Sequence, residues 1–178
     1  MMFKSLFYCA SIAVLAVTLS GCQSARKALN FDTSAVINFS ALNNINPDSD
    51  DRASPVVVHV FKLADDRQFS REDFLSLYEG AEARLGKDLL GSVVLKEITP
   101  GESRTEVIGL PPEVKFIGLM AEFIQYRNAD AIMVFPIVEH NQNIFDIAID
   151  SNKLSVYQEP ENNDLHEATR PVRSDRIH

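Results

Sequence analysis

Cysteine is scarce in this chain, and tryptophan is absent. The 178 residues include two cysteines, Cys9 and Cys22, and no Trp. Both cysteines lie in an N-terminal segment that has the features of a signal sequence and its processing site, so we expect no disulfide bond in the mature protein. The fold must then be stabilised by packing alone, even in a compartment that permits disulfides.

Positive charge and long hydrophobic runs are also lacking. The net charge is −8 at pH 7, and an acidic protein of this kind is not expected to bind nucleic acid. Beyond the N-terminus, no apolar run approaches the about 20 residues that a membrane-spanning helix needs. The most apolar stretch, residues 116–124, is short and contains Glu122. We therefore expect an acidic domain without a second membrane segment.

Sequence motifs for catalysis and for metal binding are missing. The chain has neither a G-x-S-x-G nucleophile elbow nor a glycine-rich phosphate loop. Glu139-His140 has no partner at metal-ligand spacing, and Asp48-Ser49-Asp50-Asp51 lacks the glycine and the distal glutamate of an EF-hand. His59 lies inside a predicted strand and is interpreted as a structural, hydrogen-bonded histidine. We expect no enzyme activity, no cofactor and no metal site.

The N-terminus carries the most informative motif. A basic start, Met1-Met2-Phe3-Lys4, precedes an apolar run over Leu6–Leu19 whose length is typical of a signal peptide. The run closes in Leu19-Ser20-Gly21-Cys22, which is typical of a bacterial lipoprotein processing site. We expect removal of residues 1–21 and acylation of Cys22, because several acyl chains hold a protein at a membrane far better than one. Gln23, where Asp would favour the inner membrane, points to the outer membrane. An ordinary secretory signal or a transmembrane anchor is the alternative.

The rest of the chain divides into three parts. Residues 22–33 are interpreted as a lipidated tether, residues 34–157 as a β-sandwich domain, and residues 158–178 as a disordered polar tail. Within the domain, short apolar or alternating segments are separated by turn residues, which is typical of a sandwich. About eight strands are predicted, at residues 35–41, 56–63, 92–98, 104–108, 115–126, 131–138, 144–149 and 154–157.

One short helical insertion is predicted between the second and third strands. Ser70 is placed at its N-cap, with Asp73 as the acidic partner of a capping box. Gly80 is expected to end this helix, and residues 81–85 to form a second helical piece. The apolar stripe consists of Phe74, Leu75, Leu77 and Tyr78.

The loop between the first two strands is the most distinctive feature of the domain. It is about a dozen residues long, although two to five residues are enough to join two strands. Long ordered loops are often functional, and Pro47 and Pro55 limit the freedom that is lost on docking. We interpret the loop as a partner-binding surface, the alternative being an idle surface loop. The candidate residues are Asn43, Asn44, Ile45, Asn46, Pro47, Asp48, Ser49, Asp50, Asp51, Arg52, Ala53 and Ser54.

Several motifs follow these features in a specific order. They are Val56-Val-Val-x-Val-Phe-x-Leu63, Phe69-Ser-x-x-Asp-Phe-x-x-Leu-Tyr78, Leu85-Gly-x-Asp-Leu-Leu90, Thr99-Pro-Gly-Glu102 and Ile117-Gly-Leu-Met-Ala-Glu-Phe123. Together with the lipoprotein motif, they resemble the TssJ (SciN) family of type VI secretion lipoproteins over residues 34–157. A Trp-Arg pair that the family pattern has after the Gly-Leu-Met-Ala strand is missing here, and the C-terminal tail is longer than that pattern needs.

The resemblance implies a transthyretin-like β-sandwich that is anchored in the outer membrane and faces the periplasm. Members of this family bind the periplasmic C-terminal region of the inner-membrane protein TssM and, with TssL, form a trans-envelope complex. The family loop implicated in that contact corresponds to residues 43–54. Because this segment is acidic, a complementary basic patch on the partner is expected.

Two other classes of function remain open at this point. A periplasmic lipoprotein hydrolase would assemble Ser, His and Asp side chains that are distant in the sequence. A binding module for a small ligand, or a pilotin-like binder of a secreted subunit, would use the same fold, because a fold alone does not decide function.

Overall fold

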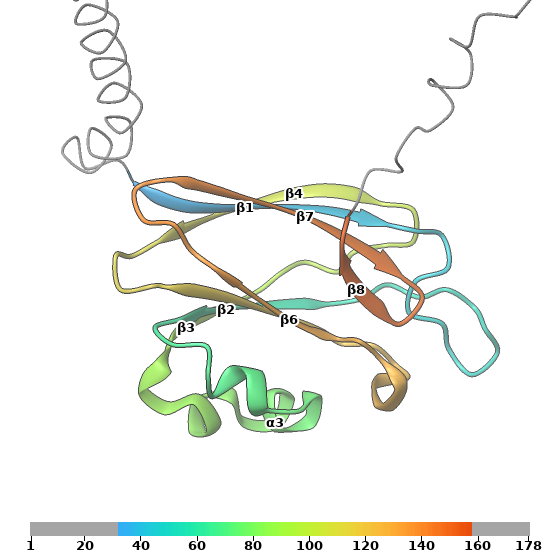
Figure 1. Cartoon of the computed structure of the whole chain (residues 1–178). Coiled ribbons are helices and arrows are strands. Elements are labelled where there is room, and N and C mark those ends of the chain that lie inside the picture. Colours follow the sequence, from blue (N-terminus) through green and yellow to red (C-terminus); the bar gives the residue numbers. More distant parts are fainter. Residues whose placement is uncertain (1–31, 158–178) are drawn as a thin grey trace, which may run out of the picture.

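The eight predicted strands form two packed sheets. A computed structural model describes residues 32–157, and the predicted β-sandwich is confirmed (Figure 1). One sheet has the strand order β4-β1-β7-β8 and the other the order β3-β2-β5-β6. The strands are β1 (Thr33–Ala41), β2 (Val58–Leu63), β3 (Leu89–Val94), β4 (Ser103–Leu110), β5 (Phe116–Ala121), β6 (Ile132–Pro136), β7 (Gln142–Asp150) and β8 (Lys153–Val156).

The first sheet is built around β1, whose side chains alternate as the sequence predicts. Ala35, Ile37 and Phe39 are at most 1% exposed and point into the sandwich, as the two-residue period of a strand requires. β1 pairs with β4 antiparallel and with β7 parallel. Because β7 is parallel to β1, both strands end at the same end of the domain.

The second sheet is apolar on both faces. Val58 and Val60 of β2 face the space between the sheets, whereas Phe61 and Leu63 belong to a second apolar cluster on the outer face. That cluster is covered by η1 (Phe69–Arg71), α3 (Phe74–Leu85) and η2 (Gly86–Asp88), which connect β2 to β3 (Figure 1). The predicted helical insertion therefore lies between strands 2 and 3, and its function in the fold is to close this face of the sandwich.

Close packing between η1 and β5 holds the helical cover on the sheet. The ring of Phe69 lies so near Gly118 that a Cβ atom there would be 2.4 Å from the ring. Real Cβ contacts are never that short, so only glycine fits at this position of the strand. The glycine in the Gly-Leu-Met-Ala strand therefore allows the helical insertion to pack closely on the sheet.

The start of the helix differs from the prediction. α3 is capped by Asp73, whose carboxylate accepts a hydrogen bond from the backbone N–H of Ser76 at 2.8 Å, and Ser70 lies in η1 instead. At Gly80 the backbone leaves helical geometry, with φ −170° and ψ 53°, so α3 consists of two helical pieces joined by a kink, as predicted for Gly80 and residues 81–85. The second piece packs Leu85 against the sheet and ends at Gly86, where φ is +52° and glycine is favoured.

Strand boundaries also differ at several positions. β3 begins at Leu89 rather than residue 92 and ends at Val94, and β5 ends at Ala121 rather than residue 126. The chain leaves the sheet after β5 and forms η3 (Tyr126–Asn128). Pro136 is the last residue of β6, which is an edge strand as expected for a strand that contains proline.

Some predictions fall on parts of the chain that lie outside the described residues. These are the signal peptide, the lipidation of Cys22, almost all of the tether and the disordered tail at 158–178. β1 begins at Thr33, which the prediction had placed in the tether. Among residues 32–157, no helix has the length and apolar character that crossing a bilayer requires.

Candidate functional site

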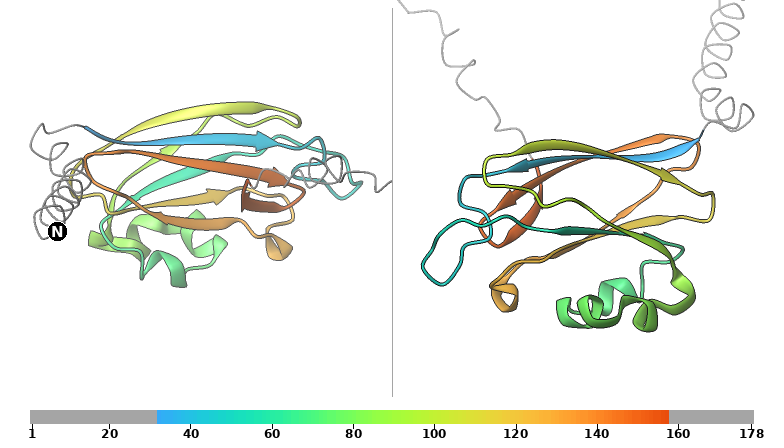
Figure 2. Two further views of the ribbon diagram at one scale, coloured as in Figure 1. Left: turned by 45° about the horizontal axis from the view of Figure 1, so that its top comes forward. Right: turned by 180° about the vertical axis from the view of Figure 1, so that it is seen from behind.

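The loop between β1 and β2 projects from the end of the sandwich where β1 finishes. Figure 2 shows it in both views, at the opposite end of the domain from the start of β1. The β5–β6 connection with η3, the β7–β8 turn and the turn at 99–102 lie at the same end (Figure 1). The loop therefore has neighbours from three other connections, and its hydrogen bonds go to all of them.

Asn46 and Ile45 form the base of the loop. Ile45 is 0% exposed and belongs to the main core, and Asn46 is 2% exposed. The side chain of Asn46 donates to Pro55 O at 2.6 Å and accepts from the N–H of Ile124 at 2.7 Å. Its backbone N–H donates to Ser151 O at 2.8 Å. Through its side chain and its backbone, this one buried residue therefore joins both ends of the loop to the β5–β6 connection and the β7–β8 turn.

Further hydrogen bonds fix the loop on both sides of this base. Asn44 Nδ2 donates to the carboxylate of Asp150 at 2.9 Å. Gln125 Nε2 donates to the carbonyl groups of both Pro47 and Asp48, each at 3.2 Å. Beside the loop, Gly101 of the turn at 99–102 has a φ of +78°, which favours glycine, and its Cα faces the exposed side chain of Asn43. The loop is thus built into the domain.

Asp48 organises the exposed tip, which consists of residues 48–52. Its carboxylate accepts from the backbone N–H groups of Asp50 at 2.8 Å and Arg52 at 3.0 Å. The guanidinium of Arg52 also donates to Asp48 Oδ2 at 2.8 Å and pairs with Asp50 at 3.2 Å. These backbone hydrogen bonds, more than the charge of Arg52, hold the pKa of the Asp48 carboxyl below its ordinary value.

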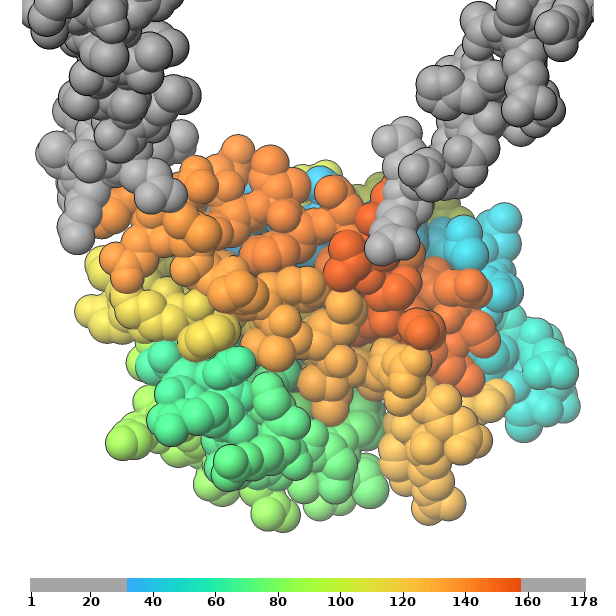
Figure 3. Space-filling model, viewed as in Figure 1, coloured from blue at the N-terminus to red at the C-terminus, as the bar shows by residue number. Residues whose placement is uncertain are grey.

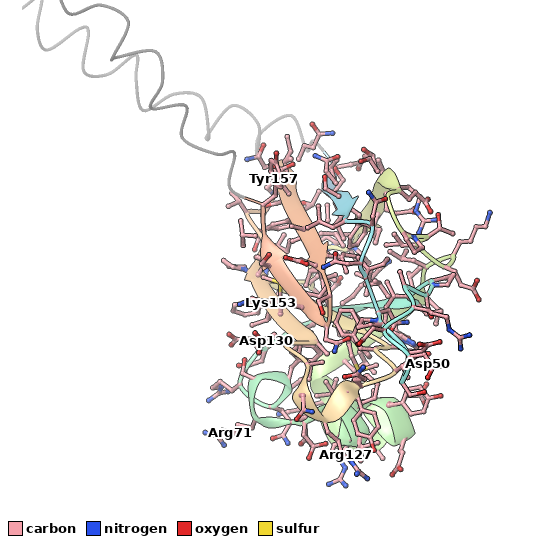
Figure 4. All side chains as sticks on the ribbon, turned by 90° about the vertical axis from the view of Figure 1, so that its right-hand side faces the viewer. Asp50, Arg71, Arg127, Asp130, Lys153 and Tyr157 are labelled. Atoms are coloured by element: carbon pink, nitrogen blue, oxygen red, sulfur yellow. The ribbon has the colours of Figure 1, made fainter. Side chains whose placement is uncertain are left out.

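The candidate residues divide into two groups according to their exposure. Ile45 and Asn46 are buried, so they shape the loop and do not offer a surface. The exposed members are Asn43, Asn44, Ser49, Asp50, Asp51, Arg52 and Ala53, while Pro47, Asp48 and Ser54 are half-buried. Figure 4, which looks onto this end of the domain, shows Asp50 to the right of Asp130 and Lys153 and above Arg127. Nothing in the sequence distinguishes the buried Asn46 from its exposed neighbours Asn43 and Asn44.

The Asp48–Asp51 segment, whose sequence resembles a fragment of a calcium-binding loop, binds its own backbone and Arg52 in the structure. The Asp48 carboxylate is occupied by its own backbone and by Arg52, so its oxygens do not form an open cage with Asp50. Among the described residues, there is no group of three or more His, Cys, Asp and Glu side chains suited to hold a metal ion. The loop is therefore stabilised by internal hydrogen bonds.

Both histidines in the described part of the chain contact neighbouring residues of the fold. His59 Nε2 contacts a carboxylate oxygen of Glu122, and its ring stacks on Phe61. The backbone N–H of His140 donates to Thr33 Oγ1 at 2.8 Å, and neighbouring Glu139 contacts Lys115. His59 thus makes the hydrogen bond that was expected for a structural histidine.

Comparisons with known proteins agree with this architecture. The family model T6SS-SciN, described as type VI secretion lipoprotein, VasD, EvfM, TssJ, matches residues 33–152. The fold is similar to the T6SS lipoprotein TssJ1 from Pseudomonas aeruginosa, at 25% identity and a TM-score of 0.67, with 72% of this chain and 98% of that chain covered. No curated protein matches the chain.

Two further solved structures have the same fold. Serratia marcescens Lip, described as a membrane-bound component of the type VI secretion system, is 20% identical with a TM-score of 0.65, over 73% of this chain and 99% of that chain. A chain in the structure described as the T6SS protein TssM C-terminal domain from EAEC is 20% identical with a TM-score of 0.59, over 71% of this chain and 99% of that chain. Since the family model spans most of the chain and the sandwich matches these structures, the chain belongs to the TssJ (SciN) family of type VI secretion lipoproteins.

Proposed function

We propose that this lipoprotein holds the type VI secretion membrane complex at the outer membrane. Lipid on Cys22 anchors it, and the loop at residues 43–54 binds the periplasmic C-terminal region of a TssM-like inner-membrane protein. TssL joins the complex through that partner. The lipoprotein acts by position and contact, without catalysis and without a cofactor.

The opposite placement of the anchored end and the loop carries this proposal. The described chain begins beside Thr33, and the loop follows the other end of β1 (Figure 2). β1 has nine residues, which at about 3.3 Å per residue is about 30 Å. A lipid upstream of β1 would then hold one end near the membrane, and the loop would be directed away from it, toward the periplasm.

The loop also has the physical properties of a docking surface. Its hydrogen bonds are made within the free protein, so little conformational entropy is lost on binding. Asp50 and Asp51 are exposed at its tip, and acidic groups of this kind attract a basic patch on a partner. The solved structure described as the TssM C-terminal domain contains a chain of the same fold, which supports the choice of partner.

The surroundings of His59 give no support to the hydrolase alternative. A catalytic triad needs a serine hydroxyl within hydrogen-bond reach of the histidine. His59 Nε2 contacts the carboxylate of Glu122, and the ring of His59 stacks on Phe61. The family to which the chain belongs is a family of secretion lipoproteins and not one of enzymes.

A charge reversal tests the loop. The variant Asp50→Lys/Asp51→Lys should bind the TssM-like periplasmic region at least about tenfold more weakly, because both the steering and the contact charges change sign. Glu79→Lys/Glu82→Lys, on the exposed side of α3, changes the net charge by the same amount at another place. Equal losses in the two variants would contradict a loop-specific contact.

A second variant tests the anchor separately. Cys22→Ser should move the protein from the outer-membrane fraction to the soluble periplasmic fraction of fractionated cells. Binding of the TssM-like region in solution should be unchanged in this variant. Continued sedimentation with the outer membrane would show that the lipid on Cys22 does not hold the protein there.

A further inference from the structure

A cavity beside the loop forms part of the same end of the domain. It has a volume of about 670 Å³, within the range of about 300–1,000 Å³ that is typical of ligand sites. Its apolar floor comes from β6 and β8, through Ile132, Met133 and Leu154. Its walls come from the start of α3 and from η3. In Figure 3, α3 in green and the η3 segment in gold lie on either side of this region, below β6.

The walls of the cavity are aromatic and already stacked. The rings of Phe74 and Tyr126 are 5.2 Å apart and 21° from parallel. The guanidinium of Arg127 lies 5.7 Å from the centroid of the Tyr126 ring on the outside. Leu75, which also lines the cavity, is 41% exposed. A large apolar or aromatic side chain would bury these surfaces, and such side chains dominate the energetics of interfaces.

The η3 segment is a shared wall between the cavity and the loop. Gln125 donates two hydrogen bonds to the loop carbonyls at Pro47 and Asp48, and the next residue, Tyr126, lines the cavity. Ile124, which precedes Gln125 and whose backbone N–H donates to Asn46 Oδ1 at the loop base, is 52% exposed. The chain therefore runs directly from the residues bonded to the loop, Ile124 and Gln125, to the cavity wall at Tyr126.

The charges at the mouth restrict the occupant further. Asp130 is paired with Lys153 at 3.3 Å, and Asp73 is engaged as the cap of α3. Arg127 is placed on an aromatic ring. Because these charged groups already have partners, an uncharged occupant of the cavity is favoured over a charged one. The adjacent tip of the loop remains acidic.

We propose that this cavity receives one aromatic or long aliphatic side chain from the same protein that docks on the loop, carried on a segment whose neighbouring residues are basic. This inference rests on the proposed function, because the loop contact brings that segment to the cavity. The loop supplies electrostatic attraction, and the cavity supplies the buried apolar anchor.

Photo-crosslinking in cells that carry the complete secretion machinery tests the identity of the occupant. A photoreactive phenylalanine analogue replaces Leu75 at the cavity, Tyr78 as a control, or Ala53 in the loop, each in the full-length lipoprotein. Tyr78 is on the same helix and is 55% exposed, but it does not line the cavity. We expect the Leu75 and Ala53 positions, but not the Tyr78 position, to crosslink to the TssM-like periplasmic region.

Each other outcome overturns a specific step. Crosslinks from Leu75 to residues 158–178 of this chain, to a second copy or to a small molecule would assign the cavity to another occupant. A crosslink from Ala53 alone would remove the cavity from the interface and leave the proposed function intact. If neither position crosslinked to the TssM-like region, both the role of the cavity and the proposed function of the loop would be contradicted.

Affinity measurements on detergent-solubilised full-length protein provide the second readout. Ala129→Phe, which fills the cavity, and Tyr126→Ala, which removes its wall, should each weaken binding of the TssM-like region by about tenfold or more. Tyr78→Ala removes a ring that stacks on the same Phe74, with ring centroids 5.6 Å apart, and should change affinity less than about twofold. Unchanged affinity in both cavity variants, with thermal unfolding showing folded protein, would overturn the inference.

Discussion

The base and the tip of the β1–β2 loop are held in place in different ways. At the base, the side chains of Ile45 and Asn46 are buried, and Asn46 is bonded to Pro55 at the far end of the loop and to Ile124, 78 residues away. At the tip, Asp48 is bonded to residues two and four positions further along the chain. The base thus depends on the whole fold, whereas the tip is organised locally.

This difference separates stability from recognition within one short segment. Changes at the base should act on the free energy of unfolding, because they remove buried contacts. Changes at the exposed tip should act on partner binding and leave unfolding nearly unchanged, because surface substitutions are usually within about 0.5 kcal/mol. The following variants test that division, in order of decreasing effect on stability.

Ile45→Ala should have the largest effect on stability. The side chain is 0% exposed in the main core, and removing three carbons from such a site costs about 2–5 kcal/mol through lost burial and the remaining cavity. Urea unfolding of the periplasmic domain measures this difference. A cost below about 1 kcal/mol would show that the loop base is not part of the cooperative core.

Substitutions at Asn46 should have the next largest effect on stability. Two variants separate the contribution of its hydrogen bonds from that of its backbone conformation. Asn46→Gly loses the hydrogen bonds to Pro55 and Ile124, which should cost about 1–3 kcal/mol. Asn46→Ala loses the same bonds and also has to adopt a φ of +47°, which adds about 1 kcal/mol for a residue with a Cβ. Unfolding free energies that rank alanine above glycine in stability would contradict the observed backbone conformation.

Asp48→Asn should loosen the tip in a pH-dependent manner. The pKa of Asp48 is lowered from the ordinary value of 3.8 by hydrogen bonds from the backbone of Arg52 and Asp50. Because the folded-state pKa lies below that of the unfolded chain, the stabilisation is present above the unfolded pKa and is lost as pH falls through the folded pKa. The difference between wild type and variant should therefore be constant near neutral pH and vanish in acid.

The backbone amide resonances of Asp50 and Arg52 provide the measurement, since both N–H groups donate to the Asp48 carboxylate. They should titrate together, with a midpoint below 3.8. A midpoint above that value would mean that the tip is not closed by Asp48 in solution.

Asp50→Asn/Asp51→Asn should have the smallest effect on stability and a clear effect on binding. Both side chains are exposed, so the unfolding midpoint should move little, while affinity for the TssM-like region should fall and its dependence on salt should weaken. A large loss of stability without a change in affinity would reverse the proposed roles of base and tip.

The strands and the loop were predictable because their signals are local. Alternation of Ala35, Ile37 and Phe39 predicts the inward face of β1, and the dense Asn, Asp and Pro content of residues 43–55 predicts an irregular connection. The helix start was wrong by several residues, because Ser70 and Asp73 are both acceptable caps and packing chose between them. The break at Gly80 and the second helical piece were predictable, because glycine is a local signal for a helix end.

The sequence by itself determined the class of this protein: a lipoprotein motif, short alternating strands and a family pattern all depend on neighbouring residues and on order along the chain. Only the tertiary structure decided which residues of the loop support it and which face outward. Asn43, Asn44 and Asn46 are chemically identical, yet one of them is buried, because β5, β7 and the loop happen to meet there. Contacts between segments that lie some 80 to 110 residues apart have no local signal, so the cavity and the shared wall at η3 emerge only when the sheets are packed.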